Sequence, residues 1–285
     1  MNKQLSIVIV TYNSKSIIVD CLESISKFND LGDELELIIV DNNSRDQEKL
    51  SQIIASFAGL NIVLLKAPGN NGYGTGNNIG VRHATAPYIL IMNPDVRLIK
   101  PVFRDLLKEF GTTDNLGMAG VSFADHSSPL YLKPEYYTVL KILFIKLLQK
   151  YNLLPFNQTY MSGSFLVFDK AAFIQAGCFD EQIFLYLEEA DITNRLISNG
   201  KKIKWVDTIK VFHLTEQRKF NEKLVSAEID SLDYYCHKFQ LNRKIILSRY
   251  LMVNRMKYFI ALITRNQIKK EMFGGWVKIL KRQLA

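Results

Sequence analysis

The chain has 285 residues, of which 48% are hydrophobic and 22% charged, so it can bury a full core and is neither disordered nor fibrous. Its net charge of +8 is a C-terminal property: residues 238–285 hold twelve Lys and Arg against one acid, and residues 1–237 hold 24 basic and 27 acidic residues. This distribution argues against a nucleic-acid enzyme and favours a tail that meets an anionic membrane surface. The longest apolar run of the tail is interrupted by Arg249, Arg255 and Lys257, which argues against a spanning helix.

Cysteine usage and the N-terminus predict the compartment. Cys21, Cys178 and Cys236 are far apart and lack metal-ligand or redox spacing, which is typical of a reducing compartment. The first residues run directly into an apolar stretch without a small-residue cleavage site. We therefore expect a cytoplasmic protein.

Over the first hundred residues, apolar runs alternate with helical patterns. Strands are predicted at 5–10, 35–40, 61–65 and 88–92, with helices at 14–27, 47–57 and 76–84 between them. This alternation predicts an α/β fold with a mostly parallel sheet flanked by helices. Such sheets bind ligands at the carboxyl ends of their strands. Polar clusters occur at four of these ends: Thr11-Tyr12-Asn13, Asp41-Asn42-Asn43-Ser44, Gly69-Asn70-Asn71-Gly72 and Asn93-Pro94-Asp95.

Each cluster alone is more typical of an ordinary turn or helix cap than of chemistry. The glycine-rich stretch 69–80 is either a flexible loop or a helix start at which backbone N–H groups approach a phosphate. It is not a P-loop, and no dehydrogenase fingerprint follows the first strand. At Asn93-Pro94-Asp95 the alternatives are a simple turn and an oxygen ligand for Mg²⁺ or Mn²⁺ beside a diphosphate.

Further signals lie downstream. Residues 161–168 are predicted as a strand entered through a small-residue turn, and residues 136–150 as an amphipathic helix that packs in the core or receives a lipid-linked acceptor. A strand is also expected at 203–206. The acidic cluster Glu188-Glu189-Ala190-Asp191 opens a predicted helix. Such acids normally form a solvated helix start. Here, however, the residues that precede the cluster are aromatic and apolar, which favours carboxylates held at a cleft, where one can act as a general base.

An ordered set of motifs runs from residue 5 to residue 214: Val10-Thr11-Tyr12-Asn13, Val40-Asp41-Asn42, Gly72-Tyr73-Gly74 through Asn78-Ile79-Gly80, Asn93-Pro94-Asp95, Gly163-Ser164, and Phe179-Asp180-Glu181 through Asp191 and Arg195. This set resembles the inverting family 2 glycosyltransferases of the GT-A fold, most of all the bacterial rhamnosyltransferases that build O-antigen, capsule or cell-wall polysaccharide. The resemblance implies a Rossmann-like GT-A domain at 1–220, with a nucleotide-binding half at 1–100 and an acceptor or catalytic half at 101–220. A basic amphipathic helical tail follows at 221–285.

The resemblance also implies roles for matched positions. Asp95 matches the last acid of the family's D-x-D metal motif, and His213 matches a histidine that joins the metal or diphosphate, so a divalent cation, Mg²⁺ or Mn²⁺, is expected. Glu189 matches the catalytic Asp, with Glu188 and Asp191 beside it. Gly163, Ser164 and Arg195 are expected to support the acceptor or the base. The expected nucleotide-sugar positions are Thr11, Tyr12, Asn13, Asp41, Asn43, Gly72, Tyr73, Asn78, Arg82, Asn93 and Asp95.

Two departures from the family pattern affect these roles. Asn93 replaces the first acid of D-x-D, which leaves Asp95 as the only carboxylate of the motif. Glu189 stands where the family has Asp, so either Glu188 or Glu189 is the base, and position favours Glu189.

The implied reaction is transfer of L-rhamnose from dTDP-L-rhamnose, with UDP-sugars (hexose or N-acetylhexosamine) as the next candidate donors. The expected acceptor is a hydroxyl of a glycan or polyprenyl-diphosphate-linked sugar. The enzyme is expected on the inner face of the cytoplasmic membrane, as a peripheral protein without a nucleic-acid partner. Two other classes compete. A nucleotidyltransferase would need a glycine-rich, basic signature after the first strand, which is absent, whereas a non-catalytic nucleotide-sugar-binding protein remains open.

Overall fold

The computed structural model describes residues 2–125, 129–151, 155–214 and 220–285, which form two compact units. Unit 1 comprises Met1–Pro129, Met161–Phe184 and Glu188–Leu214. Unit 2 comprises Leu130–Tyr160, Leu185–Leu187 and Thr215–Ala285. The segment 130–160, which the sequence analysis assigned to the acceptor half of the transferase domain, thus groups with the C-terminal helices.

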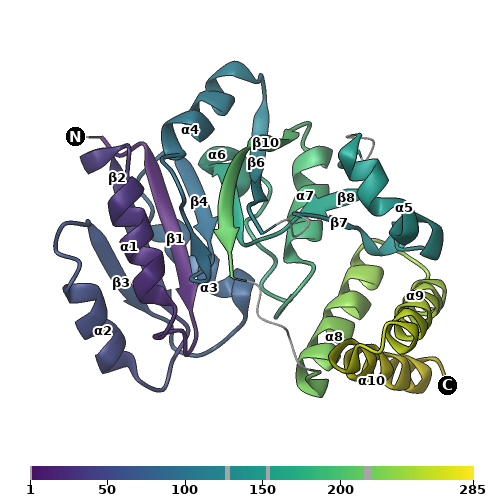
Figure 1. Cartoon of the computed structure of the whole chain (residues 1–285). Coiled ribbons are helices and arrows are strands. Elements are labelled where there is room, and N and C mark those ends of the chain that lie inside the picture. Colours follow the sequence, from purple (N-terminus) through teal and green to yellow (C-terminus); the bar gives the residue numbers. More distant parts are fainter. Residues whose placement is uncertain (1, 126–128, 152–154, 215–219) are drawn as a thin grey trace. The chain divides into compact units, whose positions relative to one another are not determined.

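Unit 1 is built on an eight-stranded sheet with the strand order β3-β2-β1-β4-β9-β6-β10-β5 (Figure 1). Its strands are β1 (Leu5–Thr11), β2 (Leu35–Asp41), β3 (Ile62–Lys66), β4 (Tyr88–Met92), β5 (Val96–Arg97), β6 (Leu116–Phe123), β9 (Phe165–Asp169) and β10 (Lys202–His213). Its helices are α1 (Ile18–Phe28), α2 (Gln47–Ala55), α3 (Tyr73–His83), α4 (Phe103–Thr112), α6 (Lys170–Gln175) and α7 (Glu188–Ser198).

The first half of the sheet is parallel, as predicted. β1 pairs in parallel with β2 and β4, and β2 with β3. Nearly every residue of β1 and β2 is buried, because helices cover both faces of a parallel sheet and each strand must be apolar throughout. The second half is mixed: β9 runs antiparallel to both β4 and β6, whereas β10 runs parallel to β6. The mostly parallel sheet flanked by helices confirms the predicted α/β, GT-A-like fold.

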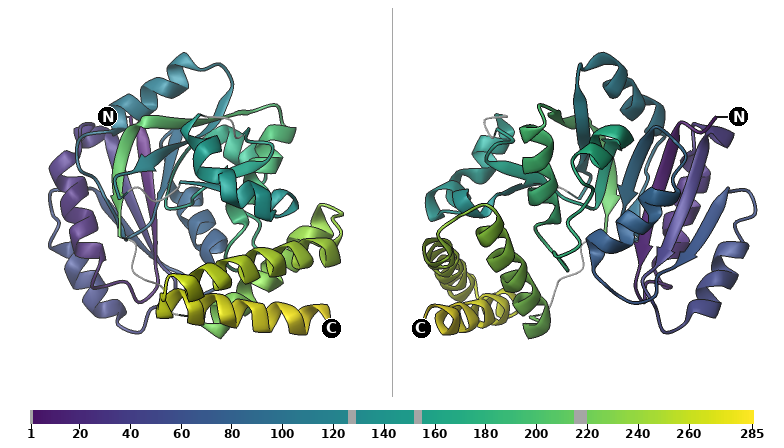
Figure 2. Two further views of the ribbon diagram at one scale, coloured as in Figure 1. Left: turned by 45° about the vertical axis from the view of Figure 1, so that its right-hand side comes forward. Right: turned by 180° about the vertical axis from the view of Figure 1, so that it is seen from behind.

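The two faces of β1 receive different helices. The alternate residues Leu5, Ile7 and Ile9 join the core that holds the apolar face of α1. On the other face, a Cβ atom at Gly80 of α3 would lie 2.4 Å from the Val8 side chain. Figure 2 shows α3 on the face of the sheet opposite to α1. Glycine in α3 therefore lets this helix approach the sheet closely.

Element boundaries differ from the predictions where turns and glycines lie. The helix expected at 14–27 starts only at Ile18, after a turn in which the Ile17 and Ile18 N–H groups donate to the Ser14 carbonyl. The helix expected at 76–84 already starts at Tyr73 and contains the glycines in its interior. The strand expected at 203–206 extends over Lys202–His213.

Glu36 lies in β2 and is 7% exposed. Its carboxylate accepts hydrogen bonds from the Ser6 hydroxyl, from the Thr85 hydroxyl at 3.0 Å and from the N–H groups of Thr85 and Ala86. Although burial alone would raise its pKa, these donors hold the pKa of Glu36 below its usual value. This carboxylate thereby ties the turn between α3 and β4 to the first two strands.

The described residues of unit 2 form four α-helices, a short 3-10 helix (Pro134–Tyr136) and most of a short sheet. The helices are α5 (Val139–Lys150), α8 (Glu222–Lys238), α9 (Arg243–Ile263) and α10 (Gln267–Leu284), and β7 (Leu130–Leu132) pairs with β8 (Thr159–Met161). α9 and α10 run side by side (Figure 2). Burial lowers the pKa of Lys133 to about 8, and its ammonium donates to the Phe156 carbonyl at 2.8 Å. Every helix in the described ranges is too short or too polar to span a bilayer.

Candidate active site

The loops that follow β1 and β2 hold each other through side-chain to backbone hydrogen bonds. The Asn13 N–H donates to the Ser44 hydroxyl at 2.8 Å, and the Asn13 side chain accepts from the Arg45 N–H at 3.1 Å. Asp41 is buried and accepts from the Ser44 N–H and, at 3.4 Å, from the Thr11 hydroxyl. The residues that are expected to hold the base and ribose of the nucleotide therefore lie in two loops that are connected by hydrogen bonds.

Tyr12 and Asn43 are both exposed residues of these two loops. The Tyr12 side chain is 49% exposed. Asn43 has a φ of +62°, a left-handed conformation that asparagine tolerates better than most residues. Tyr12 thus offers a large accessible ring beside the buried Asp41.

The start of α3 requires a glycine at position 72. Gly72 has a φ of +101°, and a Cβ atom there would lie 2.3 Å from the Phe184 carbonyl oxygen. The Gly72 carbonyl accepts from the Asn42 amide at 2.9 Å, while the Tyr73 N–H donates to the Phe184 carbonyl at 2.9 Å. These contacts fix the first turn of α3 against the segment that precedes α7.

Asn78 and Arg82, both expected near the sugar diphosphate, contact the segment 179–181. Asn78 donates to the Phe179 carbonyl at 2.9 Å and to the Glu181 carboxylate at 3.0 Å, and it accepts from the Phe179 N–H at 3.0 Å, so its amide is fully engaged with this segment. Arg82 lies 3.4 Å from the Glu181 carboxylate, and both side chains are largely exposed. Asn78 therefore anchors the segment, and Arg82 pairs with it at the surface.

Asp95 and His213 come together at the paired ends of β5 and β10. Val96 pairs with His213, and the Leu214 N–H donates to the Asp95 carbonyl at 2.9 Å. This pairing places His213 Nε2 3.4 Å from Asp95 Oδ2. The imidazole also packs on the Phe123 ring, with ring centroids 5.0 Å apart. Two residues that are 118 positions apart in the chain thus present an oxygen and a nitrogen side by side.

The turn Ser162–Ser164, which precedes β9, connects the other parts of the site. The Ser164 carbonyl accepts from the Asn93 N–H at 2.9 Å, and the Ser164 hydroxyl lies 3.3 Å from His213 Nε2. The Gly163 N–H donates to Glu189 Oε1 at 2.9 Å. A Cβ atom at Gly163 would lie 2.2 Å from that oxygen. One turn therefore contacts both the Asn93–Asp95 turn and the first turn of α7, and only glycine fits at its centre.

Glu189 is partly buried, and its environment favours the protonated form. Burial raises the pKa of Glu189 to about 7, although the hydrogen bonds from backbone N–H groups act in the opposite direction. The Tyr73 hydroxyl donates to the Gly163 carbonyl at 2.8 Å, so Tyr73 and Glu189 hold opposite ends of the same residue. Burial, together with the nearby Glu189 and Glu188 charges, raises the pKa of Tyr73 well above its usual value. The phenol is therefore a fixed hydrogen-bond donor.

The other acids of the cluster are buried, in contrast to the solvated helix start considered from the sequence. Glu188 is 2% exposed and Asp191 is fully buried. Asp191 pairs with Arg195, whose Nε donates to Oδ2 at 2.8 Å, and Arg195 also donates to the Ala176 carbonyl. The ion pair lies within α7, and the contact with the Ala176 carbonyl ties α7 to the end of α6. Asp191 and Arg195 thus brace the helix that carries Glu189.

The donor set at Asp95 fits a hard divalent cation. Asp95 Oδ1 is buried and has no hydrogen-bond partner among the described residues, while Oδ2 faces the histidine. Mg²⁺ and Mn²⁺ take oxygen and imidazole ligands and commonly use one or two carboxylates plus substrate phosphates. The described ranges contain no group of three or more His, Cys, Asp or Glu side chains suited to a metal. Phosphate oxygens would therefore have to complete the coordination.

The roles of two side chains in the candidate site were not identified from the sequence. The Tyr73 hydroxyl was assigned to the nucleotide-sugar, and its contact with Gly163 had no sequence signal. Arg97, a buried arginine behind the Asn93–Asp95 turn, was not named at all. Its only signal was a charge within the otherwise apolar run Val96-Arg97-Leu98.

Two similar proteins of known sequence are named as rhamnosyltransferases. The chain is 26% identical over 261 residues to "Rhamnosyltransferase WbbL" of Escherichia coli, which covers 85% of this chain and 94% of the relative. It is 25% identical over 225 residues to "dTDP-rhamnosyl transferase RfbF" of Shigella flexneri, with 75% and 70% covered.

Among solved structures, a mannosyltransferase from Pyrobaculum calidifontis in complex with GDP-Man and Mn²⁺ matches with a TM-score of 0.67 at 12% identity. The match covers 100% of this chain and 87% of that one. This likeness supports the fold. The family model "Glycosyl transferase family 2" matches residues 6–177. The chain is therefore a glycosyltransferase and belongs to glycosyl transferase family 2.

Proposed function

We propose that the protein is an inverting rhamnosyltransferase that moves L-rhamnose from dTDP-L-rhamnose to a hydroxyl of a glycan or lipid-linked acceptor in bacterial surface polysaccharide synthesis. The observation that carries the proposal is the turn Ser162–Ser164, which contacts both Glu189 and His213. The proposed general base and the proposed diphosphate site thereby lie on two sides of one turn. The names of the two relatives reported above support rhamnose as the sugar.

On the acceptor side, Glu189 is the general base. Its pKa of about 7 lies near the working pH of a cytoplasmic enzyme, where a base combines adequate ionisation with proton affinity. The Glu189 carboxylate removes the proton from the acceptor hydroxyl as that oxygen bonds to the anomeric carbon. The bond between this carbon and the diphosphate oxygen breaks at the same time, so one displacement inverts the anomeric configuration.

On the leaving-group side, Asp95 and His213 would hold a divalent cation. The cation, when bound, supplies positive charge that neutralises the departing diphosphate. Asp95 offers its buried Oδ1, and His213 offers Nε2, the ring nitrogen that lies 3.3 Å from the Ser164 hydroxyl. The loops that contain Tyr12 and Asp41 would hold the base and ribose of the nucleotide.

The donor can be identified by thermal shift, because a ligand that binds the folded chain raises its melting temperature. The chain is melted with dTDP-L-rhamnose, UDP-glucose or UDP-N-acetylglucosamine, each with and without Mn²⁺. We expect the largest rise with dTDP-L-rhamnose plus Mn²⁺. A larger rise with either UDP-sugar would refute rhamnose as the sugar and leave the transferase in place.

The base can be identified with a matched pair of variants. Glu189→Gln should lower transfer by roughly 10²- to 10⁴-fold, which is the usual contribution of general-base catalysis, with nucleotide binding nearly unchanged. Glu188→Gln makes the same chemical change one residue earlier and should retain most of the activity. Asp95→Ala should weaken both binding and transfer. Full transfer activity in Glu189→Gln would exclude Glu189 as the base.

The membrane part of the proposal concerns α9 and the start of α10. Residues 243–270 contain eight Lys and Arg and no acid. Large apolar side chains are exposed in the same stretch, among them Phe259 (62% exposed) and Ile263 (67% exposed), and Arg255 and Arg265 beside them are also exposed. Exposed apolar groups among cations suit the interface of a bilayer that contains anionic lipids. We expect this surface to dock peripherally on the cytoplasmic membrane.

Vesicle sedimentation tests the docking surface. The full chain should pellet with phosphatidylglycerol-containing vesicles at low salt, less at high salt, and little with phosphatidylcholine alone. The double variant Phe259→Ser, Ile263→Ser should pellet less, whereas Ile99→Ser, which alters an exposed isoleucine of unit 1, should behave like the unaltered chain. Equal pelleting with both vesicle types, or none, would contradict the docking surface.

A further inference from the structure

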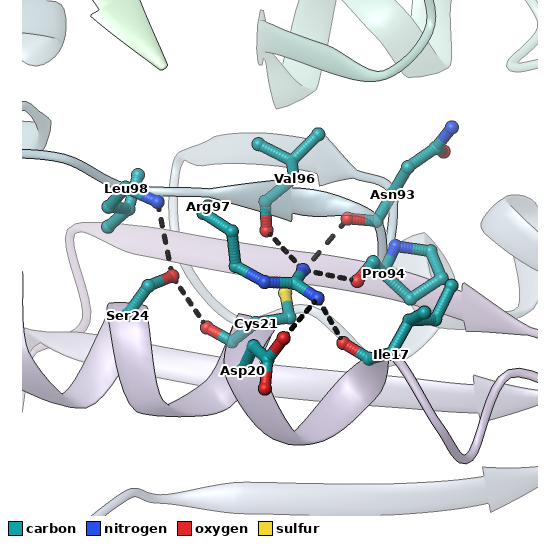
Figure 3. A network of polar contacts seen from close by, with 9 residues as sticks. All are labelled: Ile17, Asp20, Cys21, Ser24, Asn93, Pro94, Val96, Arg97 and Leu98. Carbon is teal, nitrogen blue, oxygen red and sulfur yellow. Dashed lines mark hydrogen bonds and ion pairs between the residues drawn. The ribbon is translucent and has the colours of Figure 1, made fainter. Parts of the chain in front are cut away.

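The side chain of Arg97 lies directly behind the Asn93–Asp95 turn and is only 11% exposed. One terminal nitrogen, Nη1, donates to the Pro94 carbonyl at 2.7 Å and to the Val96 carbonyl at 2.9 Å. These are the carbonyls on either side of Asp95, and Figure 3 shows both contacts. The guanidinium therefore fixes the backbone from which the Asp95 carboxylate projects.

The second terminal nitrogen of Arg97 reaches a different part of the chain. Nη2 donates to the Ile17 carbonyl at 2.5 Å and lies 3.4 Å from the Asp20 carboxylate (Figure 3). Ile17 immediately precedes α1 and ends the loop that starts at Tyr12. One planar group thus joins the turn that carries Asp95 to the loop that is expected to hold the nucleotide.

The nature of these partners explains why the residue must be an arginine. The Asp20 side chain is 65% exposed, so its ion pair with Arg97 is screened by solvent and contributes little. Three backbone carbonyls therefore supply most of the compensation for the buried charge. Arginine presents its donors in a rigid planar fork, whereas a lysine ammonium is a point charge that cannot reach both sides of Asp95 and Ile17 together.

We propose that Arg97 is a positioning residue that couples nucleotide binding in the loop 11–17 to cation binding at Asp95. The inference rests on the proposed function, because it requires a nucleotide in that loop and a cation at that carboxylate. Coupling between two sites is reciprocal: Mn²⁺ tightens the binding of dTDP by the same factor by which dTDP tightens the binding of Mn²⁺. Without the arginine fork, Asp95 and the loop move independently, so the part of this factor that passes through the protein is lost, while the part that comes from direct contact between the cation and the diphosphate remains.

The test measures the affinity for dTDP by calorimetry, with and without Mn²⁺, in the unaltered chain and in Arg97→Lys. In the unaltered chain Mn²⁺ should tighten dTDP binding by roughly tenfold or more, a usual size for coupling between sites. In Arg97→Lys the factor should fall by about threefold or more, with the metal-free affinity largely kept, and the remainder reflects direct contact between the cation and the diphosphate. A residue that only stabilised the fold would lower the melting temperature and leave the factor unchanged, and that result would overturn the inference.

Two variants provide matched controls. Arg104→Lys alters another arginine of unit 1 that holds a backbone carbonyl, that of Asp30 at 2.6 Å, and should leave the Mn²⁺ factor unchanged. Asp20→Asn removes the negative charge of the exposed partner and keeps the carbonyl contacts, so it should also retain the factor. Loss of the factor in Asp20→Asn to the same extent as in Arg97→Lys would overturn the role of the carbonyl contacts.

Hydrogen exchange of the unaltered chain provides a measurement that does not depend on the folding of a variant. Thymidine monophosphate without metal should slow amide exchange in residues 93–98 as well as in the loop 11–17. Protection confined to 11–17 would overturn the coupling. If Mn²⁺ does not change the affinity for dTDP in the unaltered chain, the proposed cation site is wrong and this inference is wrong with it. If Mn²⁺ acts equally in Arg97→Lys, the inference alone fails.

Discussion

Replacing Glu189 by glutamine should both lower transfer by roughly 10²- to 10⁴-fold and stabilise the fold above neutral pH. Burial raises the pKa of Glu189 from 4.5 to about 7. Between these values the folded chain holds a proton that the unfolded chain has released, so the free energy of unfolding falls as pH rises through this window and then levels off. At 1.36 kcal/mol per pKa unit, the full cost of the buried charge is roughly 3 kcal/mol. Glutamine can still accept the hydrogen bond from the Gly163 N–H but carries no charge.

The variant should therefore gain roughly 3 kcal/mol at about pH 8 and only roughly 1 kcal/mol at about pH 5.5. For a unit of this size, 1 kcal/mol shifts the melting temperature by about 2–4 °C, so the advantage of the variant should grow by about 4–8 °C between the two pH values. Scanning calorimetry without ligand or metal measures this growth, and the transition that added dTDP shifts identifies unit 1. Glu23→Gln, on the exposed face of α1, controls for removal of one carboxylate. An advantage of equal size at both pH values would refute the reasoning.

Four further outcomes are expected. The rate of transfer should fall on the acid side with an apparent pKa near 7, because Glu189 must be ionised to accept a proton, and a pH–rate profile measures this. Gly163→Ala should lower transfer by about 100-fold while dTDP binding persists, since its Cβ would lie 2.2 Å from the base and displace it. Glu36→Ala should destabilise the fold by roughly 2–4 kcal/mol near pH 7 in chemical denaturation; because the pKa of Glu36 is lowered from 4.5 in the folded chain, this loss should shrink as pH falls from 4.5 through the lowered pKa. Gly80→Ala should cost about 1–3 kcal/mol by overpacking α3 on β1, whereas Gly111→Ala, with open space around it, should not lower the melting temperature.

The parallel half of the sheet could be predicted because its sequence signals are local. Strands buried on both faces are continuous apolar runs, and turn residues mark their ends. β4 occupies the predicted residues 88–92, and β2 extends the prediction by one residue. The insertion of β9 between β4 and β6 could not be predicted, since nothing within residues 165–169 specifies which distant strand they pair with or in which direction.

The glycine-rich stretch shows how local propensity misleads. Glycine is unfavourable inside a helix, so the pattern placed a loop before residue 76. The helix nevertheless starts at Tyr73, because Gly76 and Gly80 let α3 approach the sheet at positions where a Cβ atom would clash. Tertiary packing thus compensates for the weak propensity, and single-sequence reasoning has no access to that compensation.

Within the candidate site, the residues that follow strands were easier to name than those that connect them. Asp95 and Asp41 are recognisable because polar side chains end apolar runs. Arg97 could not be assigned, because its partners are backbone carbonyls, which carry no sequence signature, and because a buried charge interrupts rather than continues a periodic pattern. The same holds for the Tyr73 hydroxyl, whose acceptor is the Gly163 carbonyl 90 residues away.

The direction of β9 explains why a turn can unite this site. In a purely parallel sheet only the segments that follow strands reach the ligand-binding edge. β9 is antiparallel to β4, with Phe165 opposite Met92, so its beginning lies at the edge where β4 ends. The turn that precedes β9 therefore arrives beside the Asn93–Asp95 turn. Gly163 and Ser164 can then contact Glu189 on one side and His213 on the other. A parallel strand in the same position would bring its carboxyl end to that edge and leave Glu189 without its backbone partner.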